Sequence, residues 1–332
     1  MVNECRVDLK LITIPPSRTH NTISPFCSSL SKGPETEIHV IEVTGNTREP
    51  CVYVGGGTHG DELNGIRAVL EIADKLQEID VKGRVILVPI QNPGGYLFRE
   101  RLSPFDPIDP DWVHPGDPNG TYSKRMKYVL NQIAEKADCV IDLHTSGRGG
   151  LNNPMIYVPP ETGNGAGRRS LELALAFGGD RIVYRKKEED YGWPVRYAMP
   201  FVAVRDGRAG IYAEAGEGGA SVPEEVYVNY FVNGVLNTLR SMGMLEGLIV
   251  EQGERRIVDP RTWEVSARSS INGVFVPKTS LGSKVQRNQV LAEVLGIPNG
   301  REKLKAPTSG MVTFINTFGS VSKGERLFAV SE

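Results

Sequence analysis

Hydrophobic and polar positions alternate between two periods along the first three quarters of the chain. Residues 37–43 and 50–56 are short apolar runs bounded by turn residues, and they predict β-strands. Residues 63–76 place apolar side chains at helical spacing with charges between them, which predicts an amphipathic helix. The apolar side chains of that helix are Leu63, Ile66, Leu70, Ala73 and Leu76. Residues 84–90 form a near-continuous apolar run, typical of a strand covered on both faces.

A segment rich in proline, glycine and aspartate, residues 92–120, interrupts this alternation. Loops of this length in compact domains are usually functional or disordered. A helical pattern then begins near Tyr122, and the apolar run 139–144 predicts another strand. A strand over 211–215 and a helix over 222–242 follow. Strands that alternate with helices predict an α/β fold, with a mixed, mostly parallel sheet and helices on both of its faces.

The pattern changes near residue 250, where short strands and glycine turns replace the helical period. Apolar strands beginning at Gly273 and Gly310 each lead, nine residues on, to a Gly-Ser pair, then to a valine and a closing apolar strand. Two copies of one β-hairpin unit predict a small all-β barrel with quasi-twofold symmetry. It resembles the biotinyl/lipoyl barrels, but LGIPNGREKLKAP occupies the turn of their modified lysine, which disfavours a carrier role. The sequence therefore predicts an α/β domain over residues 1–250 and a barrel over 251–332.

Composition and charge disfavour several classes of protein. The 332 residues include 38 Lys and Arg and 40 Asp and Glu, and a net charge of −2 gives no basic surface for nucleic acid or membrane. No apolar stretch reaches the ~20 residues of a membrane-spanning helix, and the N-terminus has no signal-peptide core. Four scattered cysteines, Cys5, Cys27, Cys51 and Cys139, make no disulfide framework or metal motif. These features predict a cytoplasmic protein that binds neither nucleic acid nor membrane.

The strongest chemical signal is GGGTHGDELNG, residues 55–65. His59 and Glu62 lie three residues apart on the turn between a predicted strand and a predicted helix. A catalytic zinc ion usually takes three nitrogen, sulfur or carboxylate ligands from the protein, and a water. His-x-x-Glu alone is common by chance, but the strand and glycines before it favour a metal site.

A second signal is the strand DCVIDLH, which ends at His144. Open α/β sheets bind their ligands at the carboxyl ends of strands. Asp142 lies two residues earlier on the same face of the strand, within reach of a role in orienting a ligand. By itself, His144 fits a core histidine bonded to a carboxylate equally well. Together with His59 and Glu62, it is predicted to be the third ligand of one ion.

A third signal is IYAEAGEGG, in which Glu214 leaves a strand at the same edge of the sheet. A metallohydrolase needs a carboxylate that takes a proton from the attacking water and passes it to the leaving amine. Glu214 is the candidate for this role. Glu217 is its competitor, although its place in the turn favours an ordinary solvated carboxylate.

These segments resemble the succinylglutamate desuccinylase/aspartoacylase family, a branch of the zinc carboxypeptidase-like fold, over about residues 36–245. The segment QNPGG followed by Arg101 is similar to the family's NP…R segment. The resemblance implies one zinc ion per chain, with His59, Glu62 and His144 as its ligands. It also implies that Glu214 is the general base and acid and that Arg101 polarises the scissile carbonyl. Arg99, two residues away, is the alternative to Arg101.

One departure from the family concerns substrate recognition. The family usually has D-L-N-R-x-F-P-G, whose Asn-Arg pair binds the substrate's α-carboxylate, whereas DPDWVHPG puts Asp111 and Trp112 at those positions. This pair cannot make the bidentate bond of an arginine. Either the substrate lacks a free α-carboxylate, or it has a cationic or aromatic group that Asp111 and Trp112 bind. A third reading is that Arg125 or Arg148 replaces the family's arginine. His114, in the same loop, is expected to be a surface histidine.

The favoured function is therefore a zinc-dependent amidohydrolase, or deacylase, that acts on a small N-acylated amino acid or amine. The resemblance implies deacetylation or desuccinylation, and members of such a family commonly form oligomers, so a homo-oligomer is one expectation. A zinc carboxypeptidase is the second reading, and the missing Asn-Arg pair disfavours it. A catalytically inactive, metal-binding regulatory protein is the third, and the intact set of four site residues disfavours it. Two histidines and a carboxylate also suit nickel or cobalt.

Overall fold

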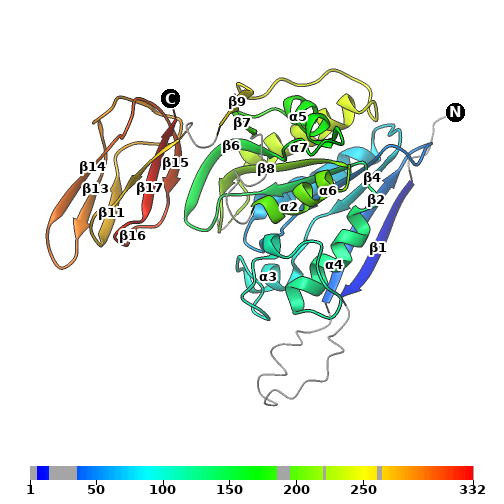
Figure 1. The fold of residues 1–332 in the computed structure, drawn as a ribbon, viewed down its shortest axis with the longest axis horizontal. Helices are drawn as coiled ribbons and strands as arrows, with labels where there is room; N and C mark the ends of the chain where they lie inside the picture. The colour runs from blue at the N-terminus through cyan, green and yellow to red at the C-terminus, as the bar shows by residue number, and fades with distance from the viewer. Residues whose placement is uncertain (1–5, 15–35, 185–194, 220–221, 260–263, 332) are drawn as a thin grey trace, which may run out of the picture.

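The computed structural model describes residues 6–14, 36–184, 195–219, 222–259 and 264–331. A mixed β-sheet with helices on both faces makes up most of it, and a small β-barrel extends from one side of that sheet (Figure 1). This arrangement confirms the predicted fold class.

The strands of the larger part form a sheet with a parallel centre. Strands β4, β3, β5 and β8 lie side by side and run parallel. At the edges of this group, β2 pairs antiparallel with β4 and β6 pairs antiparallel with β8, and β1 pairs antiparallel with β2. Beyond β6, the parallel strands β7 and β9 complete this part. The strands are β1 (Arg6–Ile14), β2 (Thr36–Thr44), β3 (Cys51–Gly56), β4 (Arg84–Val88), β5 (Cys139–His144), β6 (Gly150–Val158), β7 (Arg181–Tyr184), β8 (Ala209–Glu217) and β9 (Arg256–Val258).

Successive side chains of the central strands enter two separate hydrophobic cores. On β3, Val52 and Val54 pack with helices α2, α5 and α7, whereas Cys51 and Tyr53 pack with α4 and α6 on the other face. This alternation follows from the two-residue period of a strand. The helices are α2 (Leu63–Gln77), α3 (Pro93–Phe98), α4 (Tyr122–Ala134), α5 (Ala166–Phe177), α6 (Met199–Arg205) and α7 (Glu225–Ser241), with 3-10 turns η1 (Pro110–Trp112) and η3 (Val195–Tyr197).

Two details differ from the sequence-based expectation. The buried stripe of α2 runs through Val69 and Ile72, so Leu70 lies outside it and is 46% exposed. The segment 92–120 is not structureless, because it contains α3 and η1. Strands β1, β6 and β7 and helices α5 and α6 were not anticipated; β6, for example, contains the polar run Asn-Asn-Pro, which is atypical of a strand.

The C-terminal strands form two similar halves, as the repeat predicts. The hairpin β11–β13 and the hairpin β15–β17 pair internally, while β12 of the first half pairs with β15 and β16 of the second pairs with β11. This reciprocal exchange is the predicted quasi-twofold symmetry. The strands are β10 (Val265–Arg268), β11 (Gly273–Pro277), β12 (Lys284–Val285), β13 (Val290–Gly296), β14 (Arg301–Lys305), β15 (Gly310–Asn316), β16 (Ser320–Val321) and β17 (Arg326–Ser331).

The barrel has a hydrophobic core of its own and is also hydrogen-bonded to the larger part. Its core runs from Ala267 to Val330, and β15 pairs antiparallel with β6, with Phe314 opposite Asn152. Through this pairing, thirteen strands of the described chain form one continuous sheet. The predicted boundary at residue 250 stays a prediction.

Cys51 and Cys139 are buried free thiols, as expected, and Cys5 and Cys27 lie outside the described residues. Within the described chain, no helix combines the length and the apolar character needed to cross a membrane.

Candidate active site

The turn between β3 and α2 is shaped by close contact with α3. Gly57 has a φ of +63°, a conformation that glycine adopts without strain. The N–H of Gly60 donates to the carbonyl of Arg101 at 3.3 Å, and a Cβ atom on Gly60 would lie only 2.0 Å from the carbonyl carbon of Gly95. The glycines therefore allow the turn to pass under α3, which buries the His-x-x-Glu segment at the carboxyl end of β3.

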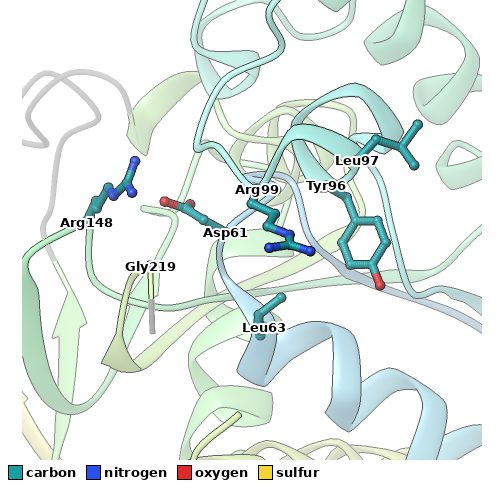
Figure 2. Close-up of a pocket in the computed structure, with 8 residues that line it drawn as sticks. Asp61, Leu63, Tyr96, Leu97, Arg99, Arg148 and Gly219 are labelled. Atoms are coloured by element: carbon teal, nitrogen blue, oxygen red, sulfur yellow. The ribbon is translucent and has the colours of Figure 1, made fainter. Parts of the chain in front are cut away.

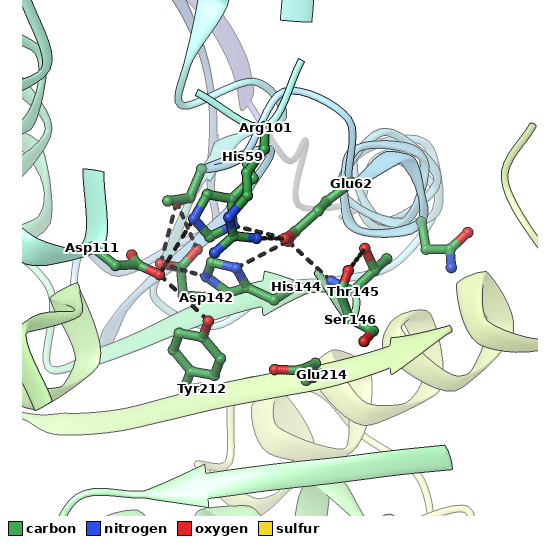
Figure 3. Close-up of polar contacts among 12 residues, drawn as sticks. His59, Glu62, Arg101, Asp111, Asp142, His144, Thr145, Ser146, Tyr212 and Glu214 are labelled. Atoms are coloured by element: carbon green, nitrogen blue, oxygen red, sulfur yellow. Dashed lines mark hydrogen bonds and ion pairs between the residues drawn. The ribbon is translucent and has the colours of Figure 1, made fainter. Parts of the chain in front are cut away.

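Two histidines face the two oxygens of one carboxylate in this turn (Figure 3). His59 Nδ1 lies 2.7 Å from Glu62 Oε1, and His144 Nδ1 lies 3.0 Å from Glu62 Oε2. All three side chains are almost fully buried. The backbone N–H of Thr145 donates to Oε2 and Arg101 Nη1 donates to Oε1, each at 3.0 Å. The structure thus brings together the three predicted metal ligands and Arg101.

The opposite nitrogen of each histidine faces another carboxylate. His59 Nε2 lies 3.1 Å from Asp109 Oδ1, and His144 Nε2 lies 3.3 Å from Asp142 Oδ2. Asp142 also accepts a hydrogen bond of 2.6 Å from Gln91. Metal-ligating histidines usually have such a partner on the second nitrogen, because it fixes the ring and its tautomer.

The donor atoms of His59, Glu62 and His144 fit a metal ion. They lie within 4.8 Å of one another, and they comprise two imidazole nitrogens and a carboxylate, a set that zinc takes in catalytic sites. Both Nδ1 atoms lie on the side of Glu62, while Asp109 lies 3.1 Å from Nε2 of His59 and Asp142 lies 3.3 Å from Nε2 of His144. The spacing and the chemistry of these donor atoms therefore make the group a candidate metal centre.

The charges around this group favour a bound cation. Burial opposes the charge on Glu62, but the two histidines outweigh it and hold the pKa of Glu62 well below its usual range. Burial also lowers the pKa of His144, yet Asp142, Asp111 and Glu62 outweigh it and raise that pKa well above its ordinary value. A surplus of carboxylates around two imidazoles gives a negative local potential.

Glu214 lies on β8 directly beside His144 of β5 (Figure 3). Asn152 on β6 donates a short hydrogen bond to its carboxylate. Burial and the nearby Glu62 raise the pKa of Glu214 to about 7, against the opposing effects of His144 and Asn152. A carboxylate with a pKa near neutrality is suited to general acid–base work.

Tyr212, two residues before Glu214 on β8, stacks on the ring of His144 with 4.1 Å between centroids. Its hydroxyl donates to Asp111 Oδ2 at 3.4 Å, and Asp111 Oδ2 lies 3.8 Å from His59 Nε2. Asp111 is fully buried, whereas Trp112 beside it is 49% exposed.

Three other residues singled out in the sequence do not contact the His59–Glu62–His144 group in any hydrogen bond or ion pair of the described chain. Arg125 is buried, and its Nη1 donates to the carbonyl of Gly120 at 2.8 Å within the segment 92–120. Arg99 lies two residues before Arg101 but lines a neighbouring cavity (Figure 2). The expectation of a surface His114 was wrong: it is 7% exposed, and burial, with Lys127 and other cations, holds its pKa well below the ordinary value.

Several residues around the site were not anticipated, namely Asp109, Lys127, Thr145, Asn152 and Tyr212. Lys127 is fully buried on α4, where its Nζ donates to Thr58 Oγ1 at 3.3 Å, and its charge helps to keep the pKa of Asp142 low. A lysine beside Met126, on the apolar side of the predicted helix, indicates a buried ammonium group that needs a polar partner. Asn152 gave no such signal, because its position depends on the pairing of β6 with β8.

The fold and the site define an α/β protein with a candidate metal centre, the buried group His59, Glu62 and His144, at the carboxyl ends of its parallel strands. The chain belongs to the succinylglutamate desuccinylase/aspartoacylase family, because the family model described as Succinylglutamate desuccinylase/Aspartoacylase catalytic domain matches residues 48–242.

Known proteins similar to this chain agree with that assignment. The N-alpha-acetyl-L-2,4-diaminobutyric acid deacetylase of Halomonas elongata is 27% identical over 288 residues, which cover 85% of this chain and 82% of that protein. The crystal structure of a succinylglutamate desuccinylase/aspartoacylase from Rhodobacter sphaeroides has a TM-score of 0.76 at 26% identity and covers 91% of each chain. A product-bound structure of the ectoine utilization protein EutE (DoeB) from Ruegeria pomeroyi shares the fold, with a TM-score of 0.81 at 21% identity over 100% of this chain and 99% of that one.

Proposed function

We propose that this protein is a zinc-dependent deacylase that hydrolyses the amide bond of a small N-acylated amino acid. The observation that supports it best is the buried group His59–Glu62–His144 with Glu214, whose pKa is about 7, on the neighbouring strand. The family supports a deacylase, and the relative from Halomonas elongata, a deacetylase by name, supports an acetyl group on an amino acid.

His59, Glu62 and His144 would hold the metal. When bound, zinc supplies a Lewis acid that polarises the acyl carbonyl and makes water more acidic. Asp109 and Asp142 keep the two imidazole rings oriented through their Nε2 atoms.

Glu214 would take one proton from the attacking water and give it to the nitrogen of the departing amine. The water oxygen forms a bond to the acyl carbon, the carbon–nitrogen bond breaks, and a carboxylic acid and an amine result. A general base works best when its pKa lies near the working pH, as the pKa of Glu214 does. Asn152 holds the carboxylate in place for both transfers.

Arg101 would stabilise the negative charge that develops on the carbonyl oxygen. Its side chain is 32% exposed, and Glu62 and Asp109 hold its guanidinium at 3.0 and 3.2 Å. Those carboxylates raise the pKa of Arg101 despite its burial, so its charge is permanent. A fixed cation of this kind requires no rearrangement during the reaction.

The substrate-binding roles of Asp111, Trp112, Arg99 and Arg125 stay predictions, as does a homo-oligomer. Asp111 contacts Tyr212 and His59, so we expect its substitution to affect the orientation of His59 as well as substrate binding.

Elemental analysis combined with an activity panel tests the proposal. We expect about one zinc per chain in the wild type, and loss of both zinc and activity in His59→Ala. His39→Ala, which removes an exposed histidine on β2, is the matched control and should retain both. The panel comprises N-acetyl and N-succinyl amino acids, N-acyl amines and short peptides.

Glu214→Ala separates catalysis from metal binding. It should retain zinc and lose about 10²–10⁴-fold in kcat, the usual contribution of a general base. No zinc in the wild type, even after zinc is supplied, would contradict the proposed metal site. Unchanged activity in Glu214→Ala would exclude its role as the base, and hydrolysis of peptides alone would indicate a carboxypeptidase.

A further inference from the structure

Strand β1 (Arg6–Ile14) forms one edge of the large sheet, and β2 is its only strand partner in the described chain (Figure 1). The outer side of β1 therefore presents backbone N–H and C=O groups that no described strand uses. Such an edge is a template for pairing with another chain, and proteins usually blunt it with charges, proline or a covering element. Nine residues without a proline make β1 a long and regular edge.

The apolar side chains of β1 favour pairing with a further strand. Leu9 and Leu11 lie on the same face of the sheet because they are two residues apart, and they are 79% and 59% exposed. Val7, on the same face, is partly buried against the core of the larger part. A second strand beside β1 would remove part of this apolar surface from water.

Charged side chains alternate with the leucines and restrict the strands that can pair with β1. Asp8 and Lys10 lie on the opposite face, with 36% and 49% of their side chains exposed. Within the chain, Asp8 accepts a hydrogen bond of 3.0 Å from Arg6 Nε, and Lys10 donates to Glu42 on β2. Like charges directly opposite each other destabilise a strand pair, whereas opposite charges stabilise it. A matching strand therefore has an acid opposite Lys10 and a base opposite Asp8.

A second copy of β1 meets this requirement in one register. Residues directly opposite each other in an antiparallel pair lie on the same face, so a twofold axis between two copies passes through a residue position. Among registers that pair at least five residues of each strand, an axis at Asp8 or Lys10 brings like charges together. An axis at Leu11 or Ile12 places the charges against isoleucines. An axis at Leu9 places Asp8 opposite Lys10 of the partner subunit, and Lys10 opposite the partner's Asp8.

We propose that this protein forms a homodimer in which two β1 strands pair antiparallel about a twofold axis at Leu9. The two large sheets then join into one, and Leu11 lies opposite the partner's Val7. Residues 6–12 of each strand face each other in this register. A single strand pair is smaller than the ~800 Å² per partner of a stable interface, so the dimer should dissociate on dilution.

Sedimentation equilibrium of the full chain over a hundredfold range of concentration tests for this dimer. We expect the mass to rise from one chain to two across the range, with or without metal and substrate. Leu9→Lys places two additional ammonium groups at the axis and should raise the dimer dissociation constant at least tenfold. Leu248→Lys, at a position that is 89% exposed, is the matched control and should leave it unchanged. A single-chain mass at every concentration, or a dimer that Leu9→Lys does not weaken, would overturn the proposal.

Exchanging the two charges tests the register. Asp8→Lys alone brings lysines together across the axis, and Lys10→Asp alone brings aspartates together, so each variant should dimerise at least tenfold more weakly. In an equimolar mixture every lysine of one variant faces an aspartate of the other, and the dimer should form again. Both changes also remove an ion pair within the chain, so thermal unfolding checks that each variant is folded. A mixture of folded variants that stays monomeric would contradict the proposed pairing, and Leu9→Lys decides if either variant is unfolded.

Discussion

Glu214 owes its proton affinity to residues on two neighbouring strands and on the turn before α2. Burial and Glu62 favour the protonated form, while His144 on β5 and Asn152 on β6 favour the charged form. The balance leaves its pKa at about 7. Activity that depends on the deprotonated form must therefore fall as the pH drops through this value.

A pH–rate profile checks this directly. Because the base is the charged form, kcat/KM should fall about tenfold per pH unit below about pH 7 and level off above it. Asn152→Ala removes a hydrogen bond that stabilises the charged form, so its acidic limb should move to higher pH. Asn229→Ala, at an exposed position of α7, should keep the wild-type profile. An acidic limb that stays in place in Asn152→Ala would contradict this account.

Lys127 is a buried cation whose charge offsets that of Asp142. Lys127→Met should lower the free energy of unfolding by about 1–3 kcal/mol, because it removes the buried hydrogen bond to Thr58 and a positive charge near Asp142. Urea denaturation measures this. Lys136→Met, at an exposed position just after α4, should change it by less than about 0.5 kcal/mol. An equally small change in Lys127→Met would show that Asp142 does not depend on the lysine.

At the scale of elements, the close approach of the β3–α2 turn to α3 determines where the proposed ligands lie. Gly60→Ala would place a Cβ atom 2.0 Å from backbone, so α3 or the turn must move. We expect a loss of roughly 1–3 kcal/mol in stability and a lower zinc content. Gly319→Ala, where a Cβ atom meets nothing within 4 Å, is the control. Wild-type zinc content and stability in Gly60→Ala would show that the contact with α3 is not needed.

Elements with a strong period could be predicted from the sequence, and so could the residues they bear at their ends. His59, Glu62 and His144 come together because β3 and β5 are parallel neighbours, a consequence of strands alternating with helices. Asp109 and Asn152 could not be predicted, because their contacts depend on how a long connection folds over the sheet and on where β6 joins it. Leu70 and His114 show the same limit. A hydrophobic pattern gives the period of a segment, but tertiary packing decides which individual side chains are buried and which are exposed.

At the scale of the whole molecule, the proposed metal couples to folding. An ion that binds only the folded chain stabilises it by about 4 kcal/mol when present at about 1,000 times its dissociation constant. Removal of zinc by a chelator should therefore lower Tm, and added zinc should restore it. Both histidines have raised pKa values, and zinc binds the neutral ring, so protons compete with it. Calorimetry should show a larger Tm difference at pH 8 than at pH 6; no difference at either pH would argue against a resident metal.

The pairing of β15 with β6 joins the barrel and the larger part of the protein in one continuous sheet. Phe314 of the barrel lies opposite Asn152, the residue that donates to Glu214. Because β6 is also held by β8 and β7, a slip of one residue in this register would turn the side chains of β15, and not those of β6, to the opposite face of the sheet. An insertion within β15 would therefore disturb the barrel before it displaced Asn152. A recombined chain with another barrel would keep this continuous sheet only if the new edge strand could pair with β6 along residues 150–152.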